Sequence, residues 1–473
     1  MSQMPTTQTQ TQQSGIWSQI ESQPMEKVIW GRLYAKNLTI TTLDLRNEEF
    51  KAGRNPSNDL CINAEHLPLK LLNGISQIHF IISKNIADLQ SPTYITDYSR
   101  NGTYVNGTLI GKGNKFILKH DDVISLSHPS YKAVVYKDEV LGQTVREFPK
   151  EIRNTYYVGK KLGNGAYGVV HLVHNAQTLQ TFAMKHVQKH LLNECSKPRL
   201  NDPERVMNEV NIIKSLQHPC VIKMHDIVDT PNSVFMVLEY MKGGDLLSRI
   251  MRNKFLPDKI AKLFFLQMCY AVGYLHAKGI THRDLKPDNI LLANEDEMTL
   301  VKVTDFGVSK FVHKDTIMRT LCGTFIYLAP EMFVSAEKNP YTQKVDIWSL
   351  GVVLFTMLSG TVPFSDDYGS PALDQIKKAK FAFRHSSWKS VSPDAKSLIR
   401  KILTVNPKDR PTINEILSST WLRDPTVVQQ AKRLMNINST GVKNPIPSSS
   451  TSDIENNNDH VFTEPPRKRP RNK

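Results

Sequence analysis

The chain has 473 residues, of which 40% are hydrophobic and 22% charged, and its formal net charge is +15 at pH 7. This length exceeds one ordinary domain, so we expect two globular domains with tails. The five cysteines form no CxxC pair, which argues for a reducing compartment and against a structural metal. No apolar run approaches the length of a membrane span, and the lysines are scattered throughout. We therefore expect a soluble intracellular protein with no membrane association and no direct DNA binding.

Residues 1–27 form a polar leader that has too few apolar side chains for a packed core, and we expect it to be disordered. The leader holds six Ser-Gln or Thr-Gln pairs, whereas shuffling its composition would give about two or three. Thr7, Thr9 and Thr11 each begin one of these pairs. Composition alone leaves open whether the pairs are filler or a signal.

Residues 28–138 consist of short alternating runs separated by turn residues, and they show no helical period. The predicted strands are VIWGRLYA, LTITTLDL, HFIISK, TYITDY, FILKH, VISLS and AVVYK. Two Asn-Gly dipeptides, at 101–102 and 106–107, supply residues that tolerate positive φ in tight turns. We expect a β-sandwich of many short strands, followed by a linker over residues 139–152.

Residues 153–422 begin with strand-rich segments and continue with segments of helical period, which is an α+β pattern. Residues 423–473 are rich in Ser, Asn and Pro and end in PPRKRPRNK, so we expect a disordered basic tail.

A glycine-rich turn opens the α+β block. Residues 163–170 have the spacing GxGxxGxV, in which a tight turn lets backbone amides approach phosphates, although this spacing alone is a weak signal. Lys185 follows in an apolar strand, where an unpaired ammonium is costly, so it needs a phosphate or carboxylate partner. Glu209, on an apparent helix, is the candidate carboxylate.

Three further motifs follow in order. They are His282-Arg283-Asp284-Leu285-Lys286-Pro287-Asp288-Asn289, Asp305-Phe306-Gly307 and Ala329-Pro330-Glu331. Together with the glycine-rich turn and Lys185, they resemble the signature set of eukaryotic Ser/Thr protein kinases over the whole block. The resemblance implies a bilobal protein kinase fold, with ATP and Mg²⁺ as cofactors and proteins as substrates.

The resemblance also implies a role for each matching residue. Asp284 would orient the substrate hydroxyl and accept its proton, and Lys286 would neutralise charge on the transferring phosphoryl group. Asn289 and Asp305 would hold the magnesium ions. Lys185 would hold the α- and β-phosphates and pair with Glu209. The residues that the resemblance assigns to ATP binding are Leu162, Gly163, Asn164, Gly165, Ala166, Tyr167, Gly168, Val170, Ala183, Lys185, Glu239, Met241 and Leu291.

Further positions resemble specificity and scaffold residues of the family. Asp245 and Asp288 lie where basophilic kinases place carboxylates against a substrate arginine near position −3, because carboxylates bind guanidinium groups bidentately. Asp346 and Arg410 resemble scaffold residues, and Arg410 is expected to pair with Glu331.

Arg283 directly precedes Asp284, which in the family implies regulation by a phosphate on the segment after Asp305. Thr320 and Thr324 are the candidate sites, and local packing is an equally good role for Thr324. Neither has arginine at −3, so self-modification there would depend on high local concentration within a dimer.

The sandwich carries a second set of polar residues in its loops. Arg54 would supply a guanidinium fork, Ser76 a hydroxyl and Asn101 an amide. Their order and spacing resemble the forkhead-associated (FHA) phosphothreonine-binding domain, in which His79 would be architectural.

The order of segments resembles the checkpoint-2-type effector kinases of the DNA-damage and replication response. The resemblance implies that an upstream kinase, which reads glutamine at +1, phosphorylates Thr7, Thr9 or Thr11. The FHA domain of a second molecule would bind the phosphothreonine, and the two kinase domains of the dimer would phosphorylate each other. The basic tail would direct the protein to the nucleus. An FHA kinase of meiotic recombination and a phosphopeptide-binding adaptor with an idle kinase domain remain alternatives.

Overall fold

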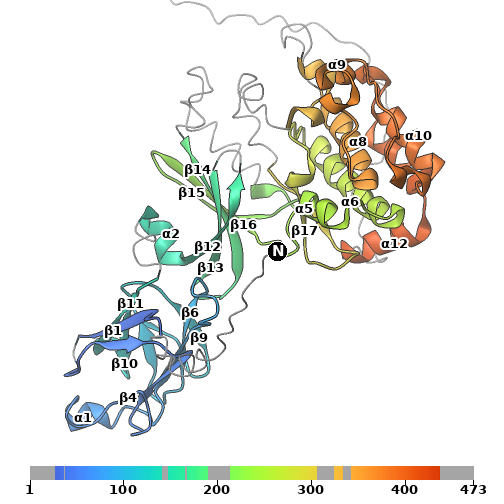
Figure 1. The fold of residues 1–473 in the computed structure, drawn as a ribbon. Coiled ribbons are helices and arrows are strands. Elements are labelled where there is room, and N and C mark those ends of the chain that lie inside the picture. Colours follow the sequence, from blue (N-terminus) through green and yellow to red (C-terminus); the bar gives the residue numbers. More distant parts are fainter. Residues whose placement is uncertain are drawn as a thin grey trace, which may run out of the picture.

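The computed structural model describes residues 27–36, 38–140, 147–165, 168–189, 214–305, 324–333 and 342–436. Figure 1 shows three bodies in chain order: a β-sandwich, a small lobe built on one sheet, and a larger helical lobe. We call them the sandwich (residues 27–140), the N-lobe (147–239) and the C-lobe (240–436).

The sandwich packs a six-stranded sheet on a five-stranded one. The first, in the order β2-β1-β11-β10-β7-β8, is built from β1 (Gly31–Ala35), β2 (Leu43–Leu45), β7 (Thr103–Val105), β8 (Thr108–Leu109), β10 (Val123–Leu126) and β11 (Lys132–Asp138). The second, in the order β4-β3-β5-β6-β9, is built from β3 (Glu49–Gly53), β4 (Leu60–Cys61), β5 (Phe80–Ser83), β6 (Thr93–Asp97) and β9 (Lys115–Leu118). The predicted β-sandwich is confirmed.

Two features of the sandwich escaped sequence analysis. Strands β3, β4, β7 and β8 were not predicted, because runs of two to five residues are too short to show alternation. One helical turn, α1 (Leu69–Leu72), also interrupts the strands. The expected tight turn at Asn106-Gly107 joins β7 to β8, with φ of 49° and 85° at the two residues.

The N-lobe is a five-stranded antiparallel sheet preceded by the short helix α2 (Lys150–Thr155). Its strands, in the order β12-β13-β14-β16-β15, are β12 (Tyr156–Gly165), β13 (Gly168–Asn175), β14 (Thr181–Gln188), β15 (Met224–Asp229) and β16 (Ser233–Glu239). Phe148 and Ile152, which precede the sheet, are buried in its core beside Phe182 and Phe235. The chain just before the sheet is therefore part of the N-lobe core.

The C-lobe is helical around one central helix. In α8 (Lys344–Ser359) every residue from Val345 onward is buried, as expected for a helix that is apolar on all sides. The other helices are α5 (Leu246–Asn253), α6 (Asp258–Ala277), α9 (Ala372–Lys377), α10 (Pro393–Ile402), α11 (Ile413–Leu417) and α12 (Pro425–Leu434). The strands β17 (Ile290–Leu292) and β18 (Val301–Val303) form a hairpin. The 3₁₀ turns are η3 (Pro287–Asn289), η5 (Thr324–Tyr327), η6 (Pro330–Phe333), η7 (Asp366–Tyr368), η8 (Ser386–Lys389), η9 (Pro407–Asp409) and η10 (Thr420–Leu422).

Helix α6 has the length and mean hydropathy, 1.2, of a membrane span, so the expectation that no apolar run approaches that length was wrong. However, 67% of its apolar window is buried inside the protein, against the neighbouring helices α8, α11 and α12 and strand β18. The apolar character of α6 is thus explained by its place in the C-lobe core.

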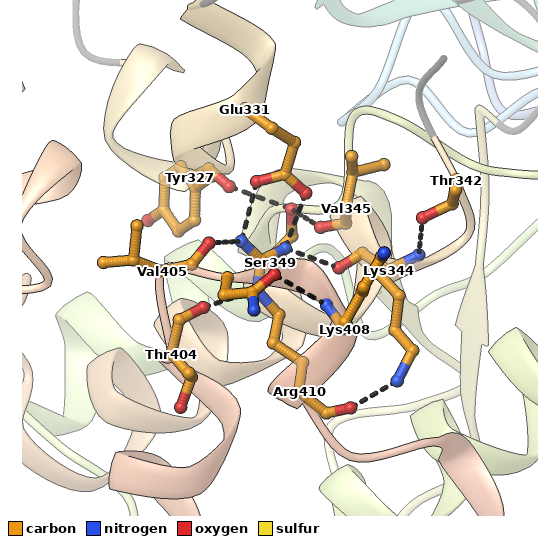
Figure 2. Close-up of polar contacts among 11 residues, drawn as sticks. Tyr327, Glu331, Thr342, Lys344, Val345, Ser349, Thr404, Val405, Lys408 and Arg410 are labelled. Carbon is orange, nitrogen blue, oxygen red and sulfur yellow. Dashed lines mark hydrogen bonds and ion pairs between the residues drawn. The ribbon is translucent and has the colours of Figure 1, made fainter. Parts of the chain in front are cut away.

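A buried ion pair joins two segments of the C-lobe that are 79 residues apart, as predicted. Arg410 is 2% exposed, and its two terminal nitrogens lie 2.7 and 2.6 Å from the two carboxylate oxygens of Glu331. The same guanidinium donates to the carbonyls of Thr404, Val405 and Lys344 (Figure 2). These five bonds match the five N–H donors of the Arg410 guanidinium, as a buried positive charge requires.

We predict that Arg410→Ala lowers the free energy of unfolding of the kinase domain by about 3–5 kcal/mol, because it leaves the Glu331 carboxylate buried and unpaired. Thermal and urea unfolding of the purified variant would measure the change. Lys408→Ala removes an exposed positive charge from the same turn and should change stability by less than about 0.5 kcal/mol. Equal effects of the two substitutions would contradict the prediction.

Candidate functional site

One edge of the sandwich brings together the three loop residues predicted to bind phosphothreonine. Arg54 follows β3, Ser76 precedes β5, and Asn101 lies between β6 and β7. The Arg54 amide donates to the Ser76 carbonyl at 2.9 Å, and the Asn101 side chain donates to the Gly74 carbonyl at 3.0 Å. The Ser76 hydroxyl accepts from the Arg100 amide at 3.0 Å. The loops that carry the Arg54, Ser76 and Asn101 side chains thus meet along one edge of the sandwich.

Gly53 makes the close approach of the first two loops possible. A Cβ atom at this position would lie 2.3 Å from the Gln77 carbonyl oxygen, a distance that no side chain tolerates. Only glycine therefore lets the Arg54 loop pack directly on the Ser76 loop.

His79 lies beneath this edge and is completely buried. Its Nδ1 accepts from the Ser76 amide at 3.2 Å, so Nε2 carries the proton and donates to the Gly102 carbonyl at 3.3 Å. Burial lowers the pKa of the imidazole to about 4, so the ring is neutral at pH 7. His79 therefore joins the Ser76 loop to the Asn101 loop, in agreement with its predicted architectural role.

Sequence analysis missed Asp97, which shapes the loop that carries Asn101. This fully buried carboxylate accepts from the amide and hydroxyl of Ser99, at 2.8 and 2.6 Å, and from the amide and hydroxyl of Thr103, at 3.1 and 2.8 Å. The available signal was an Asp followed two residues later by Ser, which is typical of a turn closed by the Asp side chain.

The glycine-rich turn joins β12 to β13, as predicted. A Cβ atom at Gly168 would lie 1.8 Å from the His186 carbonyl oxygen on β14, so only glycine fits where the hairpin meets the next strand. Leu162 is partly exposed near the end of β12. Ala166 and Tyr167 lie outside the described residues.

Lys185 on β14 is 3% exposed, and its ammonium lies 2.7 Å from the carboxylate of Asp305. The predicted need for an anionic partner is thus met by Asp305, which lies just after β18. Glu209, the partner proposed from sequence, lies outside the described residues. The pair links the N-lobe to the C-lobe at the floor of the cleft.

The segment from Asp284 to Asn289 folds back on itself beside this pair. The Asp284 carboxylate accepts from the Lys286 ammonium and from the Asn289 amide, both at 3.1 Å. The Asn289 amide also donates to the Asp284 main-chain carbonyl at 2.7 Å. The Asn289 carbonyl accepts from the amide of Thr304, the residue before Asp305, at 3.0 Å. These bonds gather the predicted catalytic and magnesium-binding side chains in one place.

Asp346, fully buried at the start of α8, fixes the backbone of this segment. Its carboxylate accepts from the main-chain amides of His282 and Arg283 and from Nε2 of His276, each at 2.8 Å. Arg283 and Asp305 both have positive φ, 67° and 62°, which is strained for residues other than glycine and is held by the surrounding bonds. Sequence analysis named Asp346 as scaffold but gave no role to His276.

The residues predicted to surround adenine come from both lobes. Ala183 is paired in register with Leu238 across β14 and β16, and Leu291 lies on β17 of the C-lobe. The Glu239 carboxylate is occupied by the Lys302 ammonium, at 2.7 Å. The Glu239 main-chain amide donates to the Lys223 carbonyl at 3.0 Å, and Met241, two residues on, is 8% exposed.

The two carboxylates expected to recognise substrate arginine differ in environment. Asp245 caps α5, where its two oxygens accept from the Ser248 amide at 2.7 Å and the Ser248 hydroxyl at 2.9 Å. Each oxygen keeps a second acceptor site. Asp288 is exposed, in the η3 turn. Thr7, Thr9, Thr11 and Thr320 lie outside the described residues, and the described part of Thr324 is limited to its backbone in η5.

The Lys185–Asp305 pair between the two lobes, with the Asp284–Asn289 segment beside it, is the arrangement of a protein kinase, and the attached sandwich has the loop arrangement of an FHA domain. Comparison with known proteins agrees. Residues 156–422 match the protein kinase domain family, and residues 50–127 match the FHA domain family. The predicted fold and enzyme class are confirmed.

Relatives match over nearly the whole chain. The ovarian-specific serine/threonine-protein kinase Lok of Drosophila melanogaster is 55% identical over 482 aligned positions, which cover 98% of each protein. The serine/threonine-protein kinase chk-2 of Caenorhabditis elegans is 34% identical, over 85% of this chain and 84% of its own length. A crystal structure of Rad53 residues 1–466 in complex with AMP-PNP matches this chain with a TM-score of 0.55 and 26% sequence identity. The match covers 83% of this chain and 99% of the Rad53 chain. This chain belongs to the checkpoint-2-type family of FHA-containing serine/threonine protein kinases.

The neutral state of His79 predicts how the FHA domain responds to acid. Its pKa is lowered by folding, so the unfolded chain binds a proton that the folded domain does not. Stability is fully present above pH 6.5 and is lost as the pH falls toward 4, by about 3 kcal/mol at most from this group. Amide hydrogen exchange in β5 and β6 at several pH values would measure the loss.

His79→Gln should flatten this pH dependence, whereas His128→Gln, which removes an exposed histidine of the same domain, should leave it unchanged. A steep dependence that persists in His79→Gln would assign the effect to another group.

Proposed function

We propose that this chain transfers the γ-phosphate of ATP to serine or threonine, with Mg²⁺, through the residues gathered around Asp284. Asp284 would orient the substrate hydroxyl and take its proton, and Lys286 would stabilise the charge of the transferring group. The solved Rad53 structure holds AMP-PNP, which supports a nucleotide site in this cleft. Lys185, already held beside Asp305, would contact the α- and β-phosphates.

The donor set fits a magnesium ion. Mg²⁺ takes one or two protein oxygens together with phosphate oxygens and water, and Asp305 and Asn289 would provide one carboxylate and one side-chain amide oxygen. The Thr304 amide, which donates to the Asn289 main-chain carbonyl, joins their two segments. When bound, the ion would neutralise the charge of the ATP phosphates. Asp288, exposed beside the cleft, and Asp245 support a preference for substrates with arginine near position −3.

We also propose the activation route. The observation that carries it is the shared edge of Arg54, Ser76 and Asn101, which offers a guanidinium, a hydroxyl and an amide to one phosphate-bearing peptide. After an upstream kinase phosphorylates Thr7, Thr9 or Thr11, the FHA edge of a second molecule binds the leader. Two kinase domains are thereby tethered, and a local concentration in the millimolar range, roughly, allows mutual phosphorylation.

Arg283 supports phosphorylation of the segment that contains Thr320 and Thr324. Its buried Nε makes no hydrogen bond to any residue that the structure describes. A buried guanidinium nitrogen without an acceptor is costly, and a phosphothreonine from the neighbouring segment would supply one. The basic tail at 467–473 supports import into the nucleus.

The catalytic role of Asp284 predicts that Asp284→Asn lowers kcat by about 10²–10⁴, since it removes the proton acceptor and keeps the side-chain size. Transfer to a peptide with arginine at −3 would be measured with the full chain. Glu295→Gln removes one exposed carboxylate on the same lobe and should leave the rate unchanged. An Asp284→Asn rate within tenfold of wild type, roughly, would overturn the assignment.

The activation route predicts that the chain binds leader peptides phosphorylated at Thr7, Thr9 or Thr11, and that Arg54→Ala weakens this binding at least about tenfold through loss of a charged hydrogen bond. Calorimetric titration would measure it. Lys132→Ala removes an exposed positive charge from the opposite sheet and should bind normally. Binding that does not depend on the phosphate, or that Arg54→Ala leaves unchanged, would contradict the phosphothreonine pocket. Failure of all three peptides contradicts the self-recognition relay and points to a different phosphoprotein.

A further inference from the structure

The FHA domain and the N-lobe touch through an apolar cluster that belongs to neither domain alone. Ile117 of β9, Tyr157 of β12 and Ala176, just after β13, are 0%, 3% and 1% exposed. The partly buried side chains packed against them are Tyr94, Phe116 and Leu179. We call this set the junction. Apolar side chains with so little exposure contribute free energy only while the two domains are in contact.

Polar contacts surround the junction. The Ile117 amide donates to the Ala176 carbonyl at 3.2 Å, so a main-chain bond crosses between the domains. The Lys119 ammonium lies 2.6 Å from the Asn154 carbonyl. The Tyr157 hydroxyl donates to the Ser91 carbonyl at 3.1 Å.

The Tyr157 hydroxyl enters a polar network of the FHA interior. The Ser91 carbonyl that it contacts also accepts from Lys84, a lysine that is 3% exposed, at 2.8 Å. Burial raises the pKa of the Tyr157 phenol well above its ordinary range, so the hydroxyl keeps its proton and remains a donor. The junction therefore has both buried apolar contacts and paired polar groups, as a specific interface requires.

The N-lobe side of the junction is the base of the β12–β13 hairpin. Tyr156 pairs with Asn175 at that end of the hairpin, and Gly165 pairs with Gly168 at the other. The tip of the hairpin is the glycine-rich turn, which the resemblance to protein kinases assigns to ATP binding. A strand of this length spans roughly 30 Å, so the FHA domain contacts one end of the hairpin and the glycine-rich turn lies at the other end.

The FHA side of the junction lies at the opposite end of the sandwich from the Arg54 edge. Thr93, the first residue of β6, pairs with Leu118, the last residue of β9, beside the junction. The chain leaves the other end of β6 into the loop that carries Asn101. Figure 1 shows the same arrangement, with β6 and β9 next to β12 and β13. The Arg54 edge thus points away from the kinase domain.

We propose that the junction is an intramolecular docking surface, through which the FHA domain holds the base of the glycine-rich hairpin and sets the affinity of the cleft for nucleotide. The FHA sandwich and the hairpin then move as one body, and the Arg54 edge stays accessible to a second molecule. This inference needs no phosphothreonine and stands apart from the activation route.

The test is Ala176→Arg in the full chain, because a long charged side chain cannot fit where alanine is 1% exposed against the FHA domain. The matched control is Thr178→Arg, the same charge change at an exposed position two residues on in the same turn. Small-angle X-ray scattering would measure the separation of the domains, and the Kd for AMP-PNP with Mg²⁺ would measure the nucleotide affinity of the kinase domain.

We expect Ala176→Arg to increase the radius of gyration and to weaken AMP-PNP binding about three- to tenfold, with Thr178→Arg like wild type. Tyr157→Phe removes only the hydroxyl, so it keeps the fold and should speed amide exchange at residues 90–93 by about two- to tenfold. An opened Ala176→Arg chain with unchanged AMP-PNP affinity overturns the coupling. Scattering and exchange that match wild type in both variants overturn the docking.

Discussion

The catalytic centre depends on one buried carboxylate. Asp346 is completely inaccessible to solvent, and a charge in such a place persists only if it is fully bonded. Its three donors come from the two amides that open the catalytic segment and from His276 on α6. Because α8 is buried along nearly its whole length, the carboxylate is fixed in the most rigid part of the C-lobe. Arg283 therefore keeps its strained backbone, and Asp284 is held in the cleft.

The FHA domain also uses a buried carboxylate to fix a loop. Asp97 is buried beneath the loop of Asn101 and accepts four hydrogen bonds from Ser99 and Thr103, and these bonds shape the loop. His79 then ties this loop to the one that carries Ser76. In both domains a buried carboxylate fixes the backbone next to the residues that we propose to meet a ligand.

Much of the fold and site was accessible from sequence because the motifs are local. Gly168 must leave room for a carbonyl oxygen, and Lys185 lies in an apolar strand. In each case a few neighbouring residues show why that residue type is needed. The spacing around Asp284 has the same property, since the loop folds back on itself within six positions. Strands of two or three residues, such as β4 and β8, were missed because alternation needs more length than they have.

By itself the sequence determined the two domain types and their order, and it predicted the reactive side chains, since both follow from short segments and their spacing. Tertiary structure alone decided which of those side chains meet. Lys185 and Asp305 are 120 residues apart yet share an ion pair, and Tyr157 reaches the Ser91 carbonyl of another domain. Contacts of this kind depend on how whole sheets and helices pack, and packing sums many weak interactions that no local pattern records.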